Sequence, residues 1–282
     1  MKTLLNIAIF LTLICTTAGS YANDGLDAVL AAQPAEVKAR YDSRHPAETL
    51  RFFRLKPGMT VVETLPGGGW YSKILSAWLG SDGKVIGADY AADLYPRFNF
   101  YDDAVLEAKK TWVDTWTAEA SAWSGANGAA IEAFQFGSLP DSMAGSADAV
   151  LLIRSLHNLA RFEKDGAYLS TALKEIKRVL KPGGVVGVVQ HMAPEGNSDS
   201  WADGSKGYLK KSFVIKTLTD AGFKLIDESQ INSNPADQPG ENDYVWRLPP
   251  TFAGSADNAD LKAKYKAIGE SNRMTLLFQK PE

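Results

Sequence analysis

Three consecutive glycines follow an apolar run that ends in an acid. Residues 61–70 read Val-Val-Glu-Thr-Leu-Pro-Gly-Gly-Gly-Trp, so the acid is Glu63 and the glycines are Gly67, Gly68 and Gly69. Glycines in a loop between a strand and a helix let the backbone approach a nucleotide-like ligand closely, because no Cβ stands in the way. The acid at the end of the strand can accept hydrogen bonds from that ligand. The segment therefore predicts a cofactor-binding site.

The elements that must position this loop alternate between strands and helices. Short apolar runs bounded by turn residues predict strands at 60–65, 84–89, 130–136, 147–154, 185–190, 223–230 and 273–279. Periodic or capped segments predict helices at 26–38, 47–54, 70–79, 102–124, 168–180, 211–221 and 260–268. The alternation predicts an α/β fold: a Rossmann-like, doubly wound, mainly parallel seven-stranded sheet with helices on both faces and an N-terminal helical extension.

We expect a single domain over residues 23–282. Its first part, 23–56, is predicted to form a helical cover, and residues 232–270 are predicted to be an insertion before the last strand. Much of that insertion is rich in Asn, Pro, Asp and Gly. Long irregular connections in compact domains are usually functional, so this segment is a candidate for a functional role.

The N-terminus has the pattern of a secretory signal peptide. Lys2 supplies a positive charge, residues 4–15 are apolar but too short to span a bilayer, and Ser20 and Ala22 are the small residues expected before a cleavage site. We expect cleavage after Ala22, a periplasmic or secreted protein, and no stable membrane insertion afterwards. Cys15 is the only cysteine, so the mature chain would have neither a disulfide nor a thiolate nucleophile.

Composition and spacing argue against two classes of partner. The net charge of -3 and the pI near 5.7 give no overall electrostatic footprint for nucleic acid. The three histidines, His45, His157 and His191, show no i,i+4 pair or similar ligand spacing, so no metal site is predicted.

The order and spacing of the motifs resemble the class I S-adenosylmethionine-dependent methyltransferases, over roughly residues 45–230 and the last strand. The matching segments are 61–69, 85–89 (Val-Ile-Gly-Ala-Asp), 137–140 (Gly-Ser-Leu-Pro), 148–150 (Asp-Ala-Val) and 173–184, which closes a helix with Leu-Lys-Pro-Gly-Gly. More narrowly, residues 44–48 (Arg-His-Pro-Ala-Glu) together with 66–71 resemble a bacterial group of exported methyltransferases. The chain departs from the family at Leu65, where the first motif usually has glycine.

This resemblance implies S-adenosyl-L-methionine as the cofactor. Gly67 and Gly69 would leave room for its amino-acid and ribose portion, Asp89 would accept hydrogen bonds from both ribose hydroxyls, and Ser138 and Leu139 would border the adenine. The complete set of implied cofactor-binding residues is Glu63, Gly67, Gly68, Gly69, Trp70, Asp89, Ser138 and Leu139.

Two other interpretations of these residues remain. Glu63 and Asp89 also fit polar strand-end residues that cap helices. In addition, Gly67-x-Gly69-x-x-Ser72 is an incomplete dinucleotide fingerprint, and Asp89 stands at a suitable distance for ribose recognition in an NAD(P) enzyme. The Lys-Pro-Gly-Gly turn and the closing strand at 273–279 favour the methyltransferase interpretation.

Candidate residues for the chemistry follow the fourth strand. Residues 156–159 (Leu-His-Asn-Leu) resemble the Leu-His-rich loop of small-molecule methyltransferases, which makes His157 the leading general base, since an ordinary histidine pKa lies near neutrality. His157 also fits a helix cap or packing residue. His45 precedes a helix expected to cover the cofactor. Arg154 and Arg44 are candidates to hold an anionic substrate group, or to make structural ion pairs. The predicted catalytic residues are His157, His45 and Arg154.

The sequence thus predicts methyl transfer from S-adenosylmethionine to a small-molecule or envelope acceptor. The alternatives are a non-catalytic periplasmic ligand-binding protein on the same fold, of which Leu65 would be a first sign, and an NAD(P)-linked oxidoreductase. Export leaves open how the cofactor would reach the enzyme.

Overall fold

The computed structural model describes residues 25–282, and the predicted signal peptide lies outside them. The strands are β1 (Thr60–Thr64), β2 (Lys84–Asp89), β3 (Ala130–Gln135), β4 (Ala147–Ile153), β5 (Leu180–Ala193), β6 (Leu209–Lys210), β7 (Lys224–Ser229) and β8 (Arg273–Gln279). Their order is β3-β2-β1-β4-β5-β8-β7, and β6 pairs with the end of β5. Strands β1 to β5 are parallel, whereas β8 runs antiparallel to both β5 and β7.

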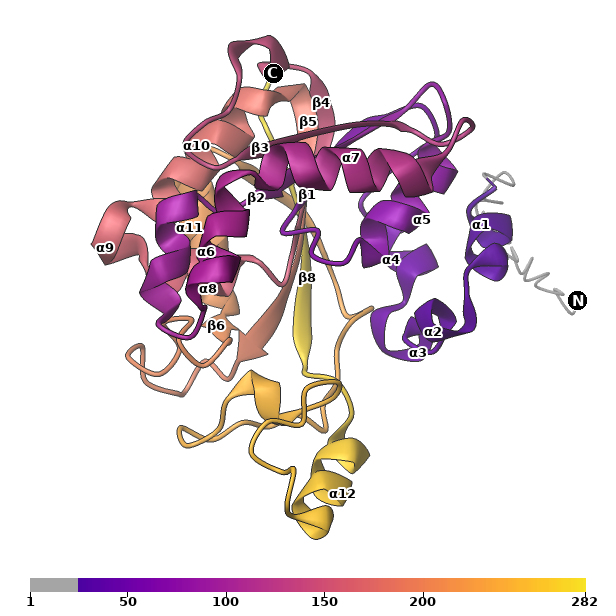
Figure 1. Ribbon diagram of the computed structural model, residues 1–282. Helices are drawn as coiled ribbons and strands as arrows, with labels where there is room; N and C mark the ends of the chain where they lie inside the picture. The colour runs from indigo at the N-terminus through magenta and orange to yellow at the C-terminus, as the bar shows by residue number, and fades with distance from the viewer. Residues whose placement is uncertain (1–24) are drawn as a thin grey trace, which may run out of the picture.

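Helices cover both faces of this sheet (Figure 1). They are α1 (Leu26–Ala32), α2 (Ala35–Lys38), α3 (Tyr41–Arg44), α4 (Pro46–Phe52), α5 (Trp70–Leu79), α6 (Asp103–Lys110), α7 (Trp112–Ser124), α8 (Leu156–Arg161), α9 (Glu163–Gly166), α10 (Tyr168–Val179), α11 (Lys211–Asp220) and α12 (Ala259–Ile268). The 3₁₀ turns are η1 (Ala92–Phe98), η2 (Asp141–Met143) and η3 (Val245–Arg247). Among the described residues, no helix combines the length and apolarity needed to cross a membrane.

Two hydrophobic cores lie on opposite faces of the sheet. Alternate residues of a strand point to opposite faces, so Val61 belongs to one core and Val62 to the other. Helices α1, α4, α5 and α7 cover the Val61 face, and α8, α10, α11 and η1 cover the Val62 face. Strands buried on both faces read as continuous apolar runs, which is why the sequence shows them so clearly.

The predicted fold class is confirmed, with one correction to the number of strands. The sheet has eight strands rather than seven. The prediction ended the fifth strand at Gln190, but β5 continues to Ala193, and Met192 and Ala193 pair with β6. The Lys-Pro-Gly-Gly turn at 181–184 bulges out of β5, because Ala147 pairs with Leu180 while Ala149 pairs with Val185.

Two predicted helices are each divided into two. The helix expected at 26–38 is interrupted at Pro34, whose ring cannot continue an α-helix from the residues before it. The helix expected at 102–124 breaks at Thr111. This break lets α7 pack Trp116 on the sheet while α6 carries Lys109 to the end of β2.

Helices α1 to α4 are held against the sheet by a close ring contact. Gly187 of β5 faces the ring of Phe53, and a Cβ at Gly187 would lie 2.5 Å from the nearest ring carbon. Phe53 is fully buried at the end of α4. The absence of a side chain at Gly187 therefore sets how closely the N-terminal helices approach the carboxyl end of the sheet.

We predict that Gly187→Ala lowers the free energy of unfolding by about 1–3 kcal/mol, because Phe53 must move to accommodate the methyl group. Urea unfolding of the protein measures this. Gly196→Ala is the matched control, since a Cβ at Gly196 would meet nothing within 4 Å and its φ is not left-handed. Equal stability of the two variants would contradict the packing described here.

Candidate functional site

The glycine loop lies at the carboxyl end of β1 and leads directly into α5. Its backbone is left-handed at Leu65 (φ 51°), Gly67 (φ 53°) and Gly69 (φ 75°). Leu65 therefore adopts a conformation in which glycine is usually found. Gly67 and Gly68 are exposed, and a Cβ at Gly68 would meet nothing within 4 Å. The loop thus presents open backbone on which a ligand can lie.

Glu63 is buried beneath this loop. It is 4% exposed, and its carboxyl group is hydrogen-bonded to the hydroxyl of Ser72. Burial raises the pKa of Glu63 to about 8, against the opposing effects of Ser72, Arg154 and Arg44. At neutral pH the carboxyl group is therefore mostly protonated, and it can donate as well as accept a hydrogen bond.

Asp89 ends β2, the strand next to β1, and its buried carboxylate already has three partners. It accepts hydrogen bonds from the backbone N–H of Tyr90 (2.9 Å) and the hydroxyl of Tyr95 (2.5 Å), and pairs with the Nζ of Lys109 (2.9 Å). A carboxylate has about four acceptor positions. A diol that used both oxygens of Asp89 would have to share or replace the contact with Lys109.

Ser138 and Leu139 lie in the loop after β3, adjacent to the end of β2. Ser138 is exposed, whereas Leu139 is buried in the core. The loop is fixed by Glu175 of α10, whose carboxylate accepts from the N–H groups of Gly137 (2.7 Å) and Leu139 (3.1 Å). The sequence analysis missed Glu175, because nothing in an amphipathic helix marks one acid as the partner of a distant loop.

His157 and His191 lie together at the ends of the next two strands. Their ring centroids are 5.6 Å apart. The Nδ1 of His157 is 3.4 Å from Oε1 of Gln190, and the amide nitrogen of Gln190 donates to the carbonyl of Gly207 (2.9 Å). This orientation of Gln190 places the proton of His157 on Nδ1 and leaves Nε2 as an acceptor.

Burial changes the expected basicity of these histidines. It lowers the pKa of His157 to about 4, with smaller effects from neighbouring groups, and it also lowers the pKa of His191. The ordinary pKa near neutrality on which the prediction for His157 depended does not apply. Its imidazole is neutral at pH 7 and a weak base, which suits hydrogen bonding better than efficient proton removal. No group of three or more His, Cys, Asp or Glu side chains in residues 25–282 could hold a metal ion.

His45 lies elsewhere. It joins α3 to α4 in a left-handed conformation (φ 42°) and lines a pocket of about 220 Å³ with Asp42, Asn232, Glu270 and Arg273. This pocket is between the N-terminal helices and the start of β8, not at the glycine loop.

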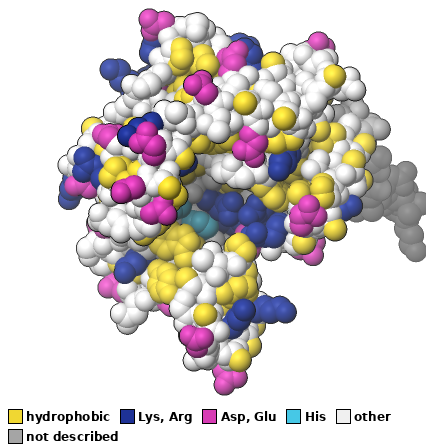
Figure 2. All heavy atoms as spheres, in the orientation of Figure 1, with side chains coloured by type: hydrophobic (Ala, Val, Ile, Leu, Met, Phe, Trp, Pro, Cys, Tyr) yellow, Lys and Arg dark blue, Asp and Glu magenta, His cyan; other side chains and the backbone are white. Residues whose placement is uncertain are grey.

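A cluster of arginines surrounds Glu270 at the entrance to β8. Arg40 donates to Glu270 (2.7 Å from Nε), Arg273 pairs with it at 3.0 Å, and Arg44 lies 3.8 Å from it. Arg44 also stacks on Trp70, with its guanidinium carbon 4.4 Å from the ring centroid. Figure 2 shows the same region as a hollow with Lys or Arg side chains and a histidine on its floor. The sequence analysis singled out only Arg44 of this cluster.

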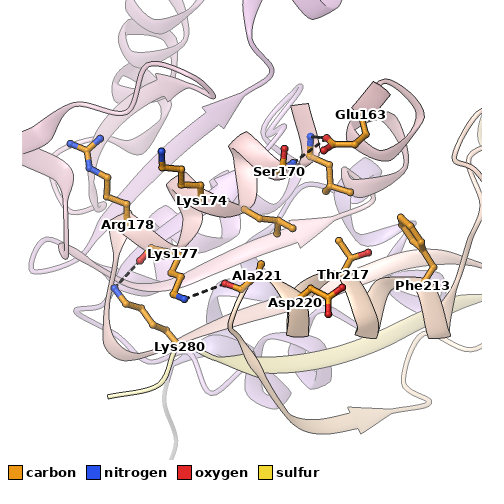
Figure 3. A pocket seen from close by; sticks show the side chains of 12 residues that line it. Glu163, Ser170, Lys174, Lys177, Arg178, Phe213, Thr217, Asp220, Ala221 and Lys280 are labelled. Atoms are coloured by element: carbon orange, nitrogen blue, oxygen red, sulfur yellow. Dashed lines mark hydrogen bonds between the residues drawn. The ribbon is translucent and has the colours of Figure 1, made fainter. Parts of the chain in front are cut away.

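A second concavity lies away from these residues. A groove of about 740 Å³ runs between α10 and α11, over Leu169 and Leu173, with a rim that includes Lys174, Lys177 and Lys280 (Figure 3). The glycine loop, the strand-end acids Glu63 and Asp89, and the three histidines do not line this groove. The candidate active site is therefore the hollow at the carboxyl end of the sheet.

Comparisons with known proteins agree with this geometry. Residues 65–188 match the family model of a methyltransferase domain. This part of the chain is therefore similar to a methyltransferase domain, and it spans the strands β2 to β4 and most of the helices that surround the glycine loop. No curated protein matches the chain.

Several solved structures are similar to this chain at low identity. A methyltransferase from Aquifex aeolicus is 16% identical, with 88% of this chain and 98% of that chain covered and a TM-score of 0.48. The arsenic(III) methyltransferase of Chlamydomonas reinhardtii is 16% identical (92% and 73% covered, TM-score 0.45). Phosphoethanolamine N-methyltransferase 2 of Haemonchus contortus, solved with S-adenosylmethionine, is 19% identical (85% and 53% covered, TM-score 0.47).

The residues present fit S-adenosylmethionine with one adjustment. The open loop at Gly67 and Gly68, the buried Glu63 and the strand-end Asp89 lie on the neighbouring strands β1 and β2, where the sequence predicts the cofactor site. The indole N–H of Trp70, at the start of α5, is buried without a hydrogen-bond partner among the described residues. The adjustment concerns the ion pair between Lys109 and Asp89, which the ribose hydroxyls would have to share or replace.

Glu63 yields a prediction on stability. Its pKa is about 8 in the folded protein and 4.5 ordinarily, so between these pH values the folded state holds the extra proton and stability falls as pH rises. Glu63→Gln removes this dependence. As the pH rises from 5 to 8, the free energy of unfolding of the variant should increase by about 2–4 kcal/mol relative to that of the wild type. Urea unfolding at both pH values measures it, with exposed Glu107→Gln as control. An unchanged pH dependence in Glu63→Gln would contradict the burial of a protonated acid.

Proposed function

We propose that this protein transfers a methyl group from S-adenosylmethionine to a small-molecule or envelope acceptor. The observation that carries the proposal is the open glycine loop with an acid at the end of each of the two strands beside it, within a methyltransferase domain. The antiparallel β8 inserted between β5 and β7 argues against the alternative of an NAD(P)-linked oxidoreductase, whose sheet characteristically has the strand order 3-2-1-4-5-6.

When bound, the cofactor would supply a sulfonium methyl group: an acceptor atom would bond to the methyl carbon in line with the carbon–sulfur bond that breaks, and S-adenosylhomocysteine would leave with the electron pair of that bond. The protein's contribution is then mainly to hold the two reactants in position. The backbone at Gly67 and Gly68 and the carboxylate of Asp89 position the cofactor. Arg154 directly follows β4, and His157 lies in the first turn of α8. In this proposal both residues contact the acceptor, and the neutral Nε2 of His157 accepts a hydrogen bond from the attacking group.

The proposal predicts that Asp89→Asn weakens binding of S-adenosylmethionine by roughly 10- to 100-fold, because charge-assisted hydrogen bonds to the ribose are lost. Calorimetric titration measures the change, and the thermal unfolding midpoint checks that the variant is folded. Asp103→Asn is the control, since Asp103 is exposed at the start of α6. Unchanged affinity in Asp89→Asn would place the cofactor elsewhere.

We further propose that the protein is exported, which the signal-peptide pattern of residues 1–22 supports. The protein purified from its native source should begin at Asn23. N-terminal sequencing or intact mass determination measures this directly. An intact Met1 would contradict export by cleavage and would remove the difficulty of supplying a cytoplasmic cofactor to an exported enzyme.

A further inference from the structure

Positive charge is in excess at the carboxyl end of the sheet. Arg40, Arg44 and Arg273 share one carboxylate, Glu270. Arg154 lies near enough to lower the pKa of both Arg44 and Arg273, in each case after the larger effect of burial. Three arginines therefore share one buried carboxylate, Glu270, and Arg154 is a fourth cation beside them; the exposed Asp42 lines the same pocket as Glu270 and Arg273.

Part of this charge has no partner within the described chain. Arg44 and Arg273 are 6% and 4% exposed, and the Nε of each is buried with no hydrogen-bond partner in residues 25–282. The guanidinium of Arg154, which is half-buried at the end of β4, makes neither a hydrogen bond nor an ion pair with any described residue. Arg44 and Arg273 keep Glu270 as their ion-pair partner, but their buried Nε donors are unsatisfied. Buried donors without an acceptor are costly, so we expect a bound anion to complete the cluster.

The cofactor does not supply the missing negative charge. S-adenosylmethionine has one carboxylate, but it also has an ammonium and a sulfonium, so it adds one net positive charge to the site. An anionic second reactant, by contrast, would lower the net positive charge of the site. A cationic acceptor would be repelled by the same four arginines.

We propose that the methyl acceptor carries an oxyanion, a carboxylate or a phosphate, which Arg154 binds together with the buried edge of Arg44 and Arg273. Guanidinium groups bind such planar or tetrahedral oxyanions through paired N–H donors. Arg154 follows β4 directly and precedes His157 by three residues, so the anion is held beside the group that faces the attacking atom. This inference rests on the proposed methyl transfer and narrows its substrate class.

The test uses inorganic phosphate as the probe. The protein, alone and saturated with S-adenosylhomocysteine, is titrated with phosphate against chloride at matched ionic strength, and the dissociation constant is taken from the rise in thermal unfolding midpoint. We expect Arg154→Gln to weaken phosphate binding at least tenfold, since Arg154 makes no structural bonds that the variant would lose. Arg54→Gln is the control, because Arg54 is exposed beyond the opposite end of α4. It should change phosphate binding less than twofold.

The other outcomes distinguish failure of this inference from failure of the proposed function. If Arg154→Gln binds phosphate as wild type does, the cluster is not an oxyanion site. If phosphate competes with S-adenosylhomocysteine and Arg154→Gln weakens both equally, the arginines bind the cofactor's own carboxylate instead. If S-adenosylhomocysteine does not bind at all, the proposed function fails, while phosphate binding to the free protein still tests the arginine cluster separately.

Discussion

The interaction on which the site depends is the sharing of Glu270 by three arginines. Arg40 and Arg44 come from the N-terminal helices, whereas Glu270 and Arg273 lie where the long segment before β8 returns to the sheet. The Glu270 carboxylate therefore connects the N-terminal helical cover, the insertion at residues 232–270 and the last strand, β8, around one hollow. Glu270, Arg44 and Arg273 are buried, so water cannot cheaply neutralise the positive charge that the single carboxylate leaves uncompensated. We therefore expect a bound anion to neutralise that charge.

The same region shows how the fold divides its two tasks. In this proposal the cofactor half, from β1 to β3, binds its ligand through the backbone of the glycine loop and two acids, Glu63 and Asp89. It requires only glycines that let the ligand approach the backbone, and parallel strands that end at the same edge of the sheet. The acceptor half, from β4 to β8, uses arginines and histidines contributed by segments far apart in the chain. Lys109 pairs with Asp89 at the edge of the proposed cofactor site.

Local sequence predicted individual strands and helices well, and the contacts between distant segments poorly. Strands β2 and β8 and helix α5 were predicted to the residue, because apolar runs and glycine stops act locally. The ion pairs of Glu270 with Arg40 and Arg44 join residues about 230 positions apart, and no spacing rule connects them. Burial likewise decides the pKa of Glu63 and His157, and burial of a polar side chain follows from tertiary packing rather than from its neighbours in sequence.

The central claim is that the glycine loop and the two strand-end acids form a site for S-adenosylmethionine. Its most direct test is parallel calorimetric titration of the protein with S-adenosylmethionine, S-adenosylhomocysteine, NAD⁺ and NADP⁺. The account predicts saturable binding of the first two and none of the nicotinamide cofactors. Binding of NAD⁺ or NADP⁺, or no binding of any of the four, would contradict it.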